Sequence, residues 1–318
     1  MKPDVWRPNR AYTFLRYYVD WCTRQSYRRL AYLGENLPED GAVILAPNHT
    51  NTLMDALVIL AGRKAPTAYG ARADIFRKPA IAKILYFLRI LPMVRQRDGL
   101  ENVKENYETF DRIDEVLEHH VPFCLFAEGA HHPGRQLQPI KKGIARIALS
   151  SARQRQTWLV PTGINYSHFF RYRGTCEVSY GKPLDISAFV REHSTLTEPQ
   201  LLQELRNLIQ EKMEPMVTPE GPASQKMTPF LLLLWPLAAL LSLPIWLAAE
   251  IICRKAKDKA WCNSIRFLCL LLLLPLTLIL WAILFGLTLP WPATVLLLMA
   301  TPFSYALFHD GLNLFRRH

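Results

Sequence analysis

The apolar residues of this chain are spread unevenly, and their distribution divides the sequence into two parts. Up to about residue 228, short apolar runs alternate with polar and charged stretches, as in a globular domain. Beyond that point three nearly continuous apolar segments follow, at 230–252, 267–289 and 290–308. Each approaches the length of about 20 residues that a membrane-spanning helix needs. Long leucine-rich runs without charge argue against a buried soluble core, so we expect a globular domain followed by a membrane-embedded region.

The charges between the apolar segments bear on their orientation. The loop "CRKAKDKAWCNSIR" and the terminal "FRRH" are both basic, and the positive-inside rule places such segments in the cytoplasm. If the globular domain is cytoplasmic too, segment 230–252 must enter and leave the membrane on one side. Pro236 and Pro244 are candidate breaks for such a re-entrant hairpin. Three simple spans, with the two basic segments on opposite sides, are the alternative; we favour the re-entrant arrangement.

The first 35 residues carry a helical pattern with two different faces. Charged residues recur every four positions from Arg16 to Arg28, while aromatic residues between positions 14 and 21 occupy another face. An aromatic face with basic neighbours is typical of a helix lying on an anionic membrane surface. A helix packed on the globular domain fits the same pattern, and both can hold together.

The stretch "GAVILAPNHTNTLMDALVIL" combines a strand, a turn and a helix. The apolar run at 42–47 predicts a buried strand, and the polar residues at 50–52 are good helix caps before the periodic apolar positions that follow. His49 therefore lies at the exit of a strand, where α/β folds bind ligands. Asp55, in the first turns of the helix, can fix the histidine tautomer and raise its basicity. The backbone N–H groups at 50–52 are candidates for stabilising an oxyanion; a capping or packing role for His49 is the alternative.

Three further apolar strands also end in polar or turn residues. They are contained in "LPMVRQRDG", "FCLFAEGAHHPG" and "WLVPTGIN", and the basic pair in "PIKKG" precedes another helix. Four strands that end in this way can converge on one site. Besides His49 and Asp55, the candidate site residues are Arg95, Arg97, Glu128, Gly129, Lys141 and Lys142.

Four blocks in the right order resemble the glycerophospholipid acyltransferase family, the PlsC-like lysophosphatidic acid and glycerol-3-phosphate acyltransferases. The blocks are Asn48-His49 with Asp55, Arg95, Glu128-Gly129-Ala130-His131, and Val160-Pro161. The resemblance covers roughly residues 40–185. It implies an α/β fold with a mixed central sheet wrapped by helices, here followed by a helical membrane-embedded C-terminal region.

The resemblance also implies roles for the candidate residues. His49, oriented by Asp55, is expected to act as general base on a glycerol hydroxyl that attacks an acyl thioester. Glu128 and Gly129 are expected to help bind the acceptor. The candidates for binding the acceptor's phosphate are Arg95, Arg97, Lys141 and Lys142.

Two departures from the family pattern qualify this resemblance. Five residues separate His49 from Asp55, one more than usual, and "EGAHH" lacks the Thr-Arg of E-G-T-R. Both departures resemble a subgroup that includes fungal glycerol-3-phosphate acyltransferases, with H-x5-D and a modified E-G-T-R block. The missing arginine leaves the acceptor open between lysophosphatidic acid and glycerol-3-phosphate.

The Pro-, Gly- and Ser-rich stretch "MVTPEGPASQKMTP" provides a boundary between the two parts of the chain. We expect a membrane-interface region at 1–35, an acyltransferase catalytic domain at 36–215, a linker at 216–229 and a transmembrane region at 230–318. The expected protein is integral to the membrane, with its catalytic domain facing the cytoplasm.

Composition limits the cofactors and partners. The six cysteines are scattered without a C-x-x-C pair and the histidine pairs lack ligand spacing, so we expect no metal site and no cofactor other than acyl-CoA or acyl carrier protein as cosubstrate. The net charge of +11 suits these acidic carriers and membrane lipids. No motif supports nucleic-acid binding. The alternative class of protein is a non-enzymatic basic scaffold anchored to the membrane. It does not explain why four strands end in polar or turn residues.

Overall fold

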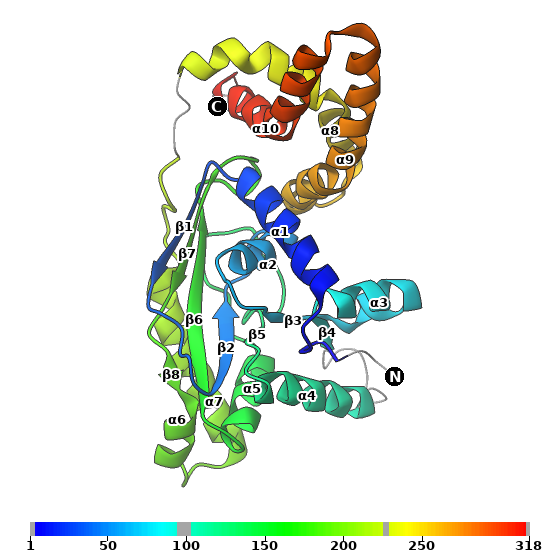
Figure 1. The fold of residues 1–318 in the computed structure, drawn as a ribbon. Helices are drawn as coiled ribbons and strands as arrows, with labels where there is room; N and C mark the ends of the chain where they lie inside the picture. Colours follow the sequence, from blue (N-terminus) through cyan, green and yellow to red (C-terminus); the bar gives the residue numbers. More distant parts are fainter. Residues whose placement is uncertain (1–3, 94–102, 225–228, 316–318) are drawn as a thin grey trace.

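The computed structural model of the chain describes residues 4–93, 103–224 and 229–315. These residues form a sheet domain and a helical C-terminal region (Figure 1). The strands are β1 Arg29–Gly34, β2 Ala42–Pro47, β3 Ala68–Arg72, β4 Ile90–Met93, β5 Phe123–Cys124, β6 Thr157–Tyr166, β7 Thr175–Tyr180 and β8 Leu184–Asp185. The helices are α1 Arg10–Gln25, α2 Leu53–Ala61, α3 Pro79–Phe87, α4 Val103–Glu118, α5 Lys142–Ala152, α6 Ile186–Glu192, α7 Glu198–Met213, α8 Trp235–Lys255, α9 Cys262–Thr288 and α10 Trp291–Phe315. Short 3₁₀ helices lie at Ala73–Phe76, Glu214–Met216, Pro229–Leu234 and Lys259–Trp261.

The sheet is mixed, as expected, with the strand order β1-β7-β6-β2-β5-β3-β4 and β8 paired to β6. Strands β2, β3, β4 and β5 pair in parallel with their neighbours, whereas β6 pairs antiparallel with β7 and β8. All six residues of β2 are buried, because this strand lies between β5 and β6 and has helices on both faces. A continuous apolar run is what such a position requires.

The strands predicted from the sequence are present. Strand β2 has the expected bounds, and β4, β5 and β6 lie within or across the other three apolar stretches. One boundary differs from the expected organisation: β1 pairs in parallel with β7 at the end of the sheet, so Arg29–Gly34 belongs to the sheet rather than to the N-terminal helical region. The sheet therefore begins before residue 36.

Helix α1 packs its basic stripe on the domain. The Arg16 guanidinium donates to the backbone carbonyls of Lys64 at 3.0 Å and Leu60 at 3.2 Å, and Arg24 donates to that of Ala61 at 2.7 Å. The Leu60 and Ala61 carbonyls belong to the C-terminal end of α2, and that of Lys64 lies just beyond it; this end of a helix carries partial negative charge. The alternative in which the helix packs on the domain therefore holds for Arg16 and Arg24.

The aromatic face of α1 is divided between solvent and the C-terminal helices. Phe14 is 80% exposed and Tyr17 is 73% exposed, whereas the Tyr18 hydroxyl donates to the carbonyl of Leu271 in α9. Figure 1 accordingly shows α1 beside α2, with the C-terminal helices next to it. The helix thus connects the sheet domain to the apolar region.

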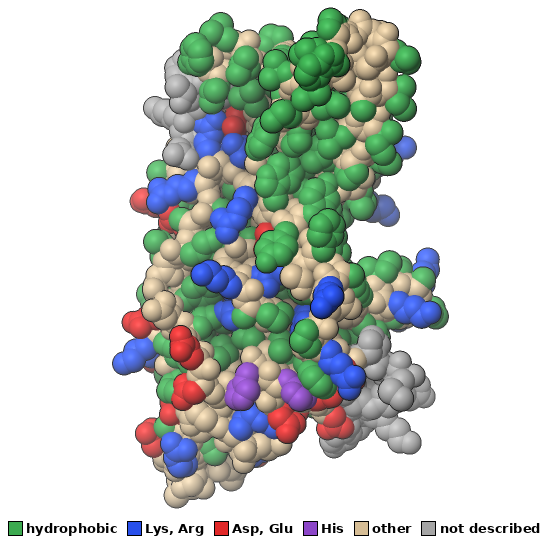
Figure 2. Space-filling view, in the orientation of Figure 1, with side chains coloured by type: hydrophobic (Ala, Val, Ile, Leu, Met, Phe, Trp, Pro, Cys, Tyr) green, Lys and Arg blue, Asp and Glu red, His purple; other side chains and the backbone are tan. Residues whose placement is uncertain are grey.

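The helices α8, α9 and α10 are each long and apolar enough to cross a membrane. Large apolar side chains along them are exposed, and Figure 2 shows a nearly continuous apolar surface over this region. The expected break of the first segment is not present: Pro236 lies in the first turn of α8, where proline is tolerated, and Pro244 lies inside the helix without ending it.

Both ends of α8 nevertheless lie near the domain. At its start, the Trp235 indole stacks on Phe308 of α10 with ring centroids 5.6 Å apart, close to the C-terminal end of that helix (Figure 1). Two residues further on, the buried Asp310 carboxylate pairs with Arg173 at 2.8 Å and with Arg28 at 3.0 Å. At its end, α8 leads into a loop that contacts the domain, as described below. This arrangement fits the favoured placement of both ends of segment 230–252 on one side, although α8 itself is continuous.

Candidate active site

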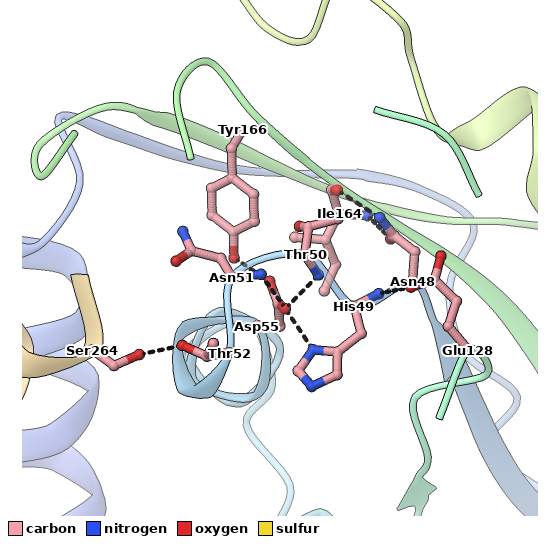
Figure 3. Close-up of polar contacts among 10 residues, drawn as sticks. All are labelled: Asn48, His49, Thr50, Asn51, Thr52, Asp55, Glu128, Ile164, Tyr166 and Ser264. Carbon is pink, nitrogen blue, oxygen red and sulfur yellow. Dashed lines mark hydrogen bonds and ion pairs between the residues drawn. The ribbon is translucent and has the colours of Figure 1, made fainter. Parts of the chain in front are cut away.

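The turn after β2 is fixed to the neighbouring strand by Asn48. Its side-chain amide donates to the carbonyl of Ile164 at 3.1 Å, and its side-chain oxygen accepts the N–H of Ile164 at 2.7 Å (Figure 3). The side chain thereby continues the pairing of β2 with β6 by one position after the strand ends. It holds His49 at the carboxyl end of the strand.

The structure brings His49 and Asp55 together, as expected from their positions around the turn. The Nδ1 atom of His49 lies 2.7 Å from Oδ2 of Asp55, and the carboxylate is completely buried while the imidazole is 17% exposed. The other ring nitrogen, Nε2, points away from Asp55 (Figure 3). With Nδ1 donating to the carboxylate, Nε2 is the ring atom available to accept a proton.

The Asp55 carboxylate also orders the turn itself. Its Oδ2 accepts the backbone N–H groups of Thr50 at 2.8 Å and Asn51 at 2.7 Å. The expectation that the N–H groups at 50–52 stabilise an oxyanion is therefore wrong for these two, because both point at Asp55. Its other oxygen, Oδ1, accepts the hydroxyl hydrogen of Tyr166 at 2.7 Å.

Tyr166 is a residue that the sequence did not indicate. It stands at the end of β6, is 1% exposed, and is separated from Asp55 by 111 positions. Burial strongly raises the pKa of its hydroxyl, so it remains a proton donor to the carboxylate at neutral pH. The only sequence signal was its place at the end of the Val-Pro strand.

Glu128 holds the turn from the opposite side. Its Oε2 accepts the backbone N–H of His49 at 2.8 Å, and its Oε1 accepts that of Gln138 at 2.9 Å. The N–H of His132 in turn donates to the His49 carbonyl at 2.8 Å. Burial raises the pKa of Glu128, opposed by the two N–H donors. We expected the Glu128 carboxylate to bind the acceptor. In the structure it joins the turn at His49 to the loop at Gln138, a role that the sequence did not predict.

Gly129 and Lys141 are brought together beside this turn. Gly129 has a φ of +68°, and a Cβ at this position would lie 3.0 Å from Cγ of Lys141. The side chains of Lys141 and Lys142 are exposed, at the start of α5. Arg95 and Arg97, the other candidates for binding phosphate, lie outside the described residues.

The C-terminal region also reaches the site. The His49 ring stacks on Phe126 at 4.0 Å and lies nearly perpendicular to His131 at 5.9 Å between centroids. Nε2 of His131 is 3.0 Å from Oδ2 of Asp258, a residue of the loop between α8 and α9. The Ala260 N–H and the His131 imidazole lower the pKa of Asp258, which keeps it ionised.

A second contact joins the turn that carries His49 to α9. The hydroxyls of Thr52 and Ser264 are 2.7 Å apart, and both side chains are buried (Figure 3). Thr52 has a φ of 49°, in the left-handed region that a threonine adopts only when its surroundings hold it there. The membrane-embedded region and the domain therefore meet at the turn that carries His49.

The site lies within a segment of known type: residues 29–165 match the protein-family model described as Acyltransferase. Over 110 residues the chain is 28% identical to glycerol-3-phosphate O-acyltransferase 1 of Saccharomyces cerevisiae, covering 33% of this chain and 14% of that protein. Over 112 residues it is 30% identical to glycerol-3-phosphate O-acyltransferase 2 of the same yeast, covering 32% of this chain and 15% of that protein. A crystal structure of the 1-acyl-sn-glycerophosphate acyltransferase PlsC from Thermotoga maritima aligns with 18% identity and a TM-score of 0.45, over 64% of this chain and 80% of that one.

The segment that matches the Acyltransferase family model, residues 29–165, contains His49, Asp55 and Glu128. The matches cover no more than 15% of the length of the two yeast proteins.

Proposed function

We propose that this chain is a membrane-bound O-acyltransferase that transfers a fatty acyl group from a thioester to the free hydroxyl of 1-acyl-glycerol-3-phosphate in phospholipid synthesis. The contact that carries this proposal is the one between His49 and the fully buried Asp55, at 2.7 Å. It stands at the carboxyl end of the central strand, inside the acyltransferase-family segment. We place the chain in the H-x5-D subgroup of that family.

The proposed reaction uses His49 as general base and then as general acid. Nε2 takes the proton of the acceptor hydroxyl while its oxygen attacks the thioester carbonyl carbon, and Asp55 stabilises the resulting imidazolium. The tetrahedral intermediate collapses with cleavage of the carbon–sulfur bond. The leaving sulfur takes the proton back from Nε2, so the products are an ester and a free thiol. General-base assistance of this kind contributes roughly 10²–10⁴-fold.

Glu128 would act by position rather than by touching the reacting atoms. Because it accepts the N–H of His49, it fixes the backbone of the base relative to the sheet. For the acceptor's phosphate we propose the exposed Lys141 beside Gly129, together with Lys142, Arg95 and Arg97.

Glycerol-3-phosphate is the second candidate acceptor. The names of the two yeast relatives favour it, since both are glycerol-3-phosphate O-acyltransferases. The donor is acyl-CoA or acyl carrier protein, either of which is acidic and suits the basic chain. We further propose that the domain faces the cytoplasm, because the basic residues on both sides of the α9–α10 hairpin obey the positive-inside rule there.

The test is acyl transfer by membranes that contain the full chain. Labelled acyl-CoA is supplied with 1-acyl-glycerol-3-phosphate or with glycerol-3-phosphate, and His49→Ala is the matched control. We expect turnover of the first acceptor by the wild type and none by the variant. Turnover of glycerol-3-phosphate alone would select the second candidate. Equal activity of His49→Ala, or no transfer from acyl-CoA or acyl carrier protein to either acceptor, would refute the proposal.

A further inference from the structure

The loop between α8 and α9 lies one imidazole ring away from His49. His131 is the intermediate: its centroid is 5.9 Å from that of His49 and 6.2 Å from that of Trp261, and its Nε2 contacts Asp258. Asp258 and Trp261 both belong to the C-terminal region, more than 90 positions after the domain's own site residues. Part of the wall around the candidate base is therefore supplied by the apolar region.

A groove of about 490 Å³ opens at this loop. Apolar side chains of the two helix ends, Ile252 and Ile265, line it together with Trp261, and Lys255 and Lys257 lie along the same groove. Both lysines are exposed, and Trp261 is 45% exposed although it is a large apolar residue. The groove shares Asp258 and Trp261 with the surroundings of His131, so it lies next to the candidate active site.

The position of the groove relates it to the membrane surface. The two apolar spans on either side of it end at Lys255 and begin again at Lys259. A molecule in the groove therefore meets apolar side chains from the membrane-embedded ends and ammonium groups from the loop. This combination matches an amphiphile with one chain and an anionic head.

Positive charge in this loop is also what the positive-inside rule requires of any cytoplasmic loop. That rule accounts for the lysines, but it does not account for the return of the loop onto the domain. Asp258 holds His131, and Ser264 holds Thr52 in a left-handed conformation, so the loop is built against the catalytic turn. An ordinary connecting loop needs neither contact.

We propose that this groove is the subsite for a single-chain anionic phospholipid acceptor, which reaches His49 from the membrane. This inference rests on the proposed function and assigns its acceptor to the lipid class. The acyl chain lies against Ile252, Trp261 and Ile265, and Lys255 and Lys257 attract the anionic head as the lipid enters, before its phosphate reaches the residues proposed above to bind it. A water-soluble acceptor such as glycerol-3-phosphate would leave the apolar side of the groove unused.

The test measures the kinetics of the full chain reconstituted in phosphatidylcholine vesicles, so that the vesicle surface carries no net charge. The variants are Trp261→Ala and the double variant Lys255→Ala/Lys257→Ala. Two matched controls lie elsewhere: Lys182→Ala removes an exposed lysine of the sheet domain, and Leu272→Ala removes a side chain of α9 that is 63% exposed.

We expect both groove variants to raise KM for 1-acyl-glycerol-3-phosphate by about tenfold or more, because the double variant loses a contact to a charged group and Trp261→Ala loses the apolar contact of a large aromatic side chain. KM for acyl-CoA should stay within about twofold of the wild type, as should both constants in the two controls. A rise in KM for acyl-CoA instead would assign the groove to the donor. Unchanged constants would remove it from the active site, and either result overturns the proposal.

A second measurement serves if a variant fails to fold or if the wild type shows no acyl transfer. The probe is 1-acyl-glycerol-3-phosphate with a photoreactive diazirine in its chain, irradiated with the His49→Ala chain in the same vesicles. An adduct within residues 252–265 that unlabelled lipid displaces supports the groove. Adducts confined to other segments, or not displaced, refute it. Because this readout needs no turnover, failure of the groove and failure of the proposed function remain distinguishable.

Discussion

Replacing Asp55 with asparagine isolates the charge of the carboxylate from its hydrogen bonds. The side-chain oxygen of asparagine can accept the same donors from Thr50, Asn51 and His49 that Oδ2 accepts now. Its amide can donate to the Tyr166 hydroxyl, which then turns from donor to acceptor. The turn and the histidine tautomer are kept, so the substitution removes chiefly the negative charge next to the imidazole.

The size of the effect follows from the geometry. Asp55 is completely buried and 2.7 Å from Nδ1, which places the centre of the imidazolium charge about 4 Å from the carboxylate. At an effective dielectric constant of about 20, the attraction between unit charges at this distance is about 4 kcal/mol. If the imidazolium forms in the transition state, losing this attraction lowers kcat roughly 10³-fold, since each 1.36 kcal/mol is about tenfold.

The assay compares acyl transfer by Asp55→Asn, His49→Ala and the wild type at saturating acceptor, with thermal unfolding in detergent measured on the same preparations. We expect Asp55→Asn to unfold close to the wild type while its kcat falls about a thousandfold. Asp55→Ala is the contrasting variant, because it leaves several buried donors without an acceptor, and it should lose stability as well. An Asp55→Asn enzyme that keeps kcat within about tenfold, while His49→Ala is inactive, would show that Asp55 only shapes the turn.

Three further changes test other contacts. Tyr166→Phe removes one hydroxyl donor from Asp55, so unfolding should be easier by about 1–2 kcal/mol while kcat falls less than tenfold, as urea unfolding and activity assays measure. The pKa of Glu128 is raised above its ordinary value near 4.5, so the stability of the wild type should fall as pH rises through that raised pKa. Glu128→Gln should lack this fall when the free energy of unfolding is measured from about pH 4 to 7. Asp310→Asn leaves two partly buried arginines without the buried anion that they share and should cost about 3 kcal/mol, seen as faster proteolysis of the linker at 216–224.

The parts of the fold that could be predicted from the sequence are those set by local patterns. The apolar run of β2 is bounded by Gly41 and ends at Pro47, and its burial by neighbours on both sides follows from its lack of alternation. The distance from His49 to Asp55 is likewise local, because a turn and the start of a helix join them. Short-range patterns therefore predicted the pairing of His49, the candidate base, with the Asp55 carboxylate.

The same reasoning could not decide which way a charged face points. The basic residues of α1 fit an anionic membrane, but they fit the carbonyl-rich end of α2 as well, since both present negative charge. Only the docking of α1 on α2 distinguishes the two. For Pro244 the difficulty was similar, because the effect of a proline on a helix depends on neighbours that support the backbone around it.

What lay beyond sequence reasoning is the way distant segments meet at His49. Its backbone N–H is held by Glu128, 79 positions away, and its carboxylate partner is held by Tyr166, 111 positions from Asp55. Asp258 approaches through His131 from a part of the chain that composition assigns to the membrane. No local pattern specifies such pairings, because any donor or acceptor that the fold brings to the same place could form these hydrogen bonds. Asp258 and Ser264 bring the apolar C-terminal region into contact with the turn that carries His49 and with its neighbour His131, which a simple anchor for the domain would not require.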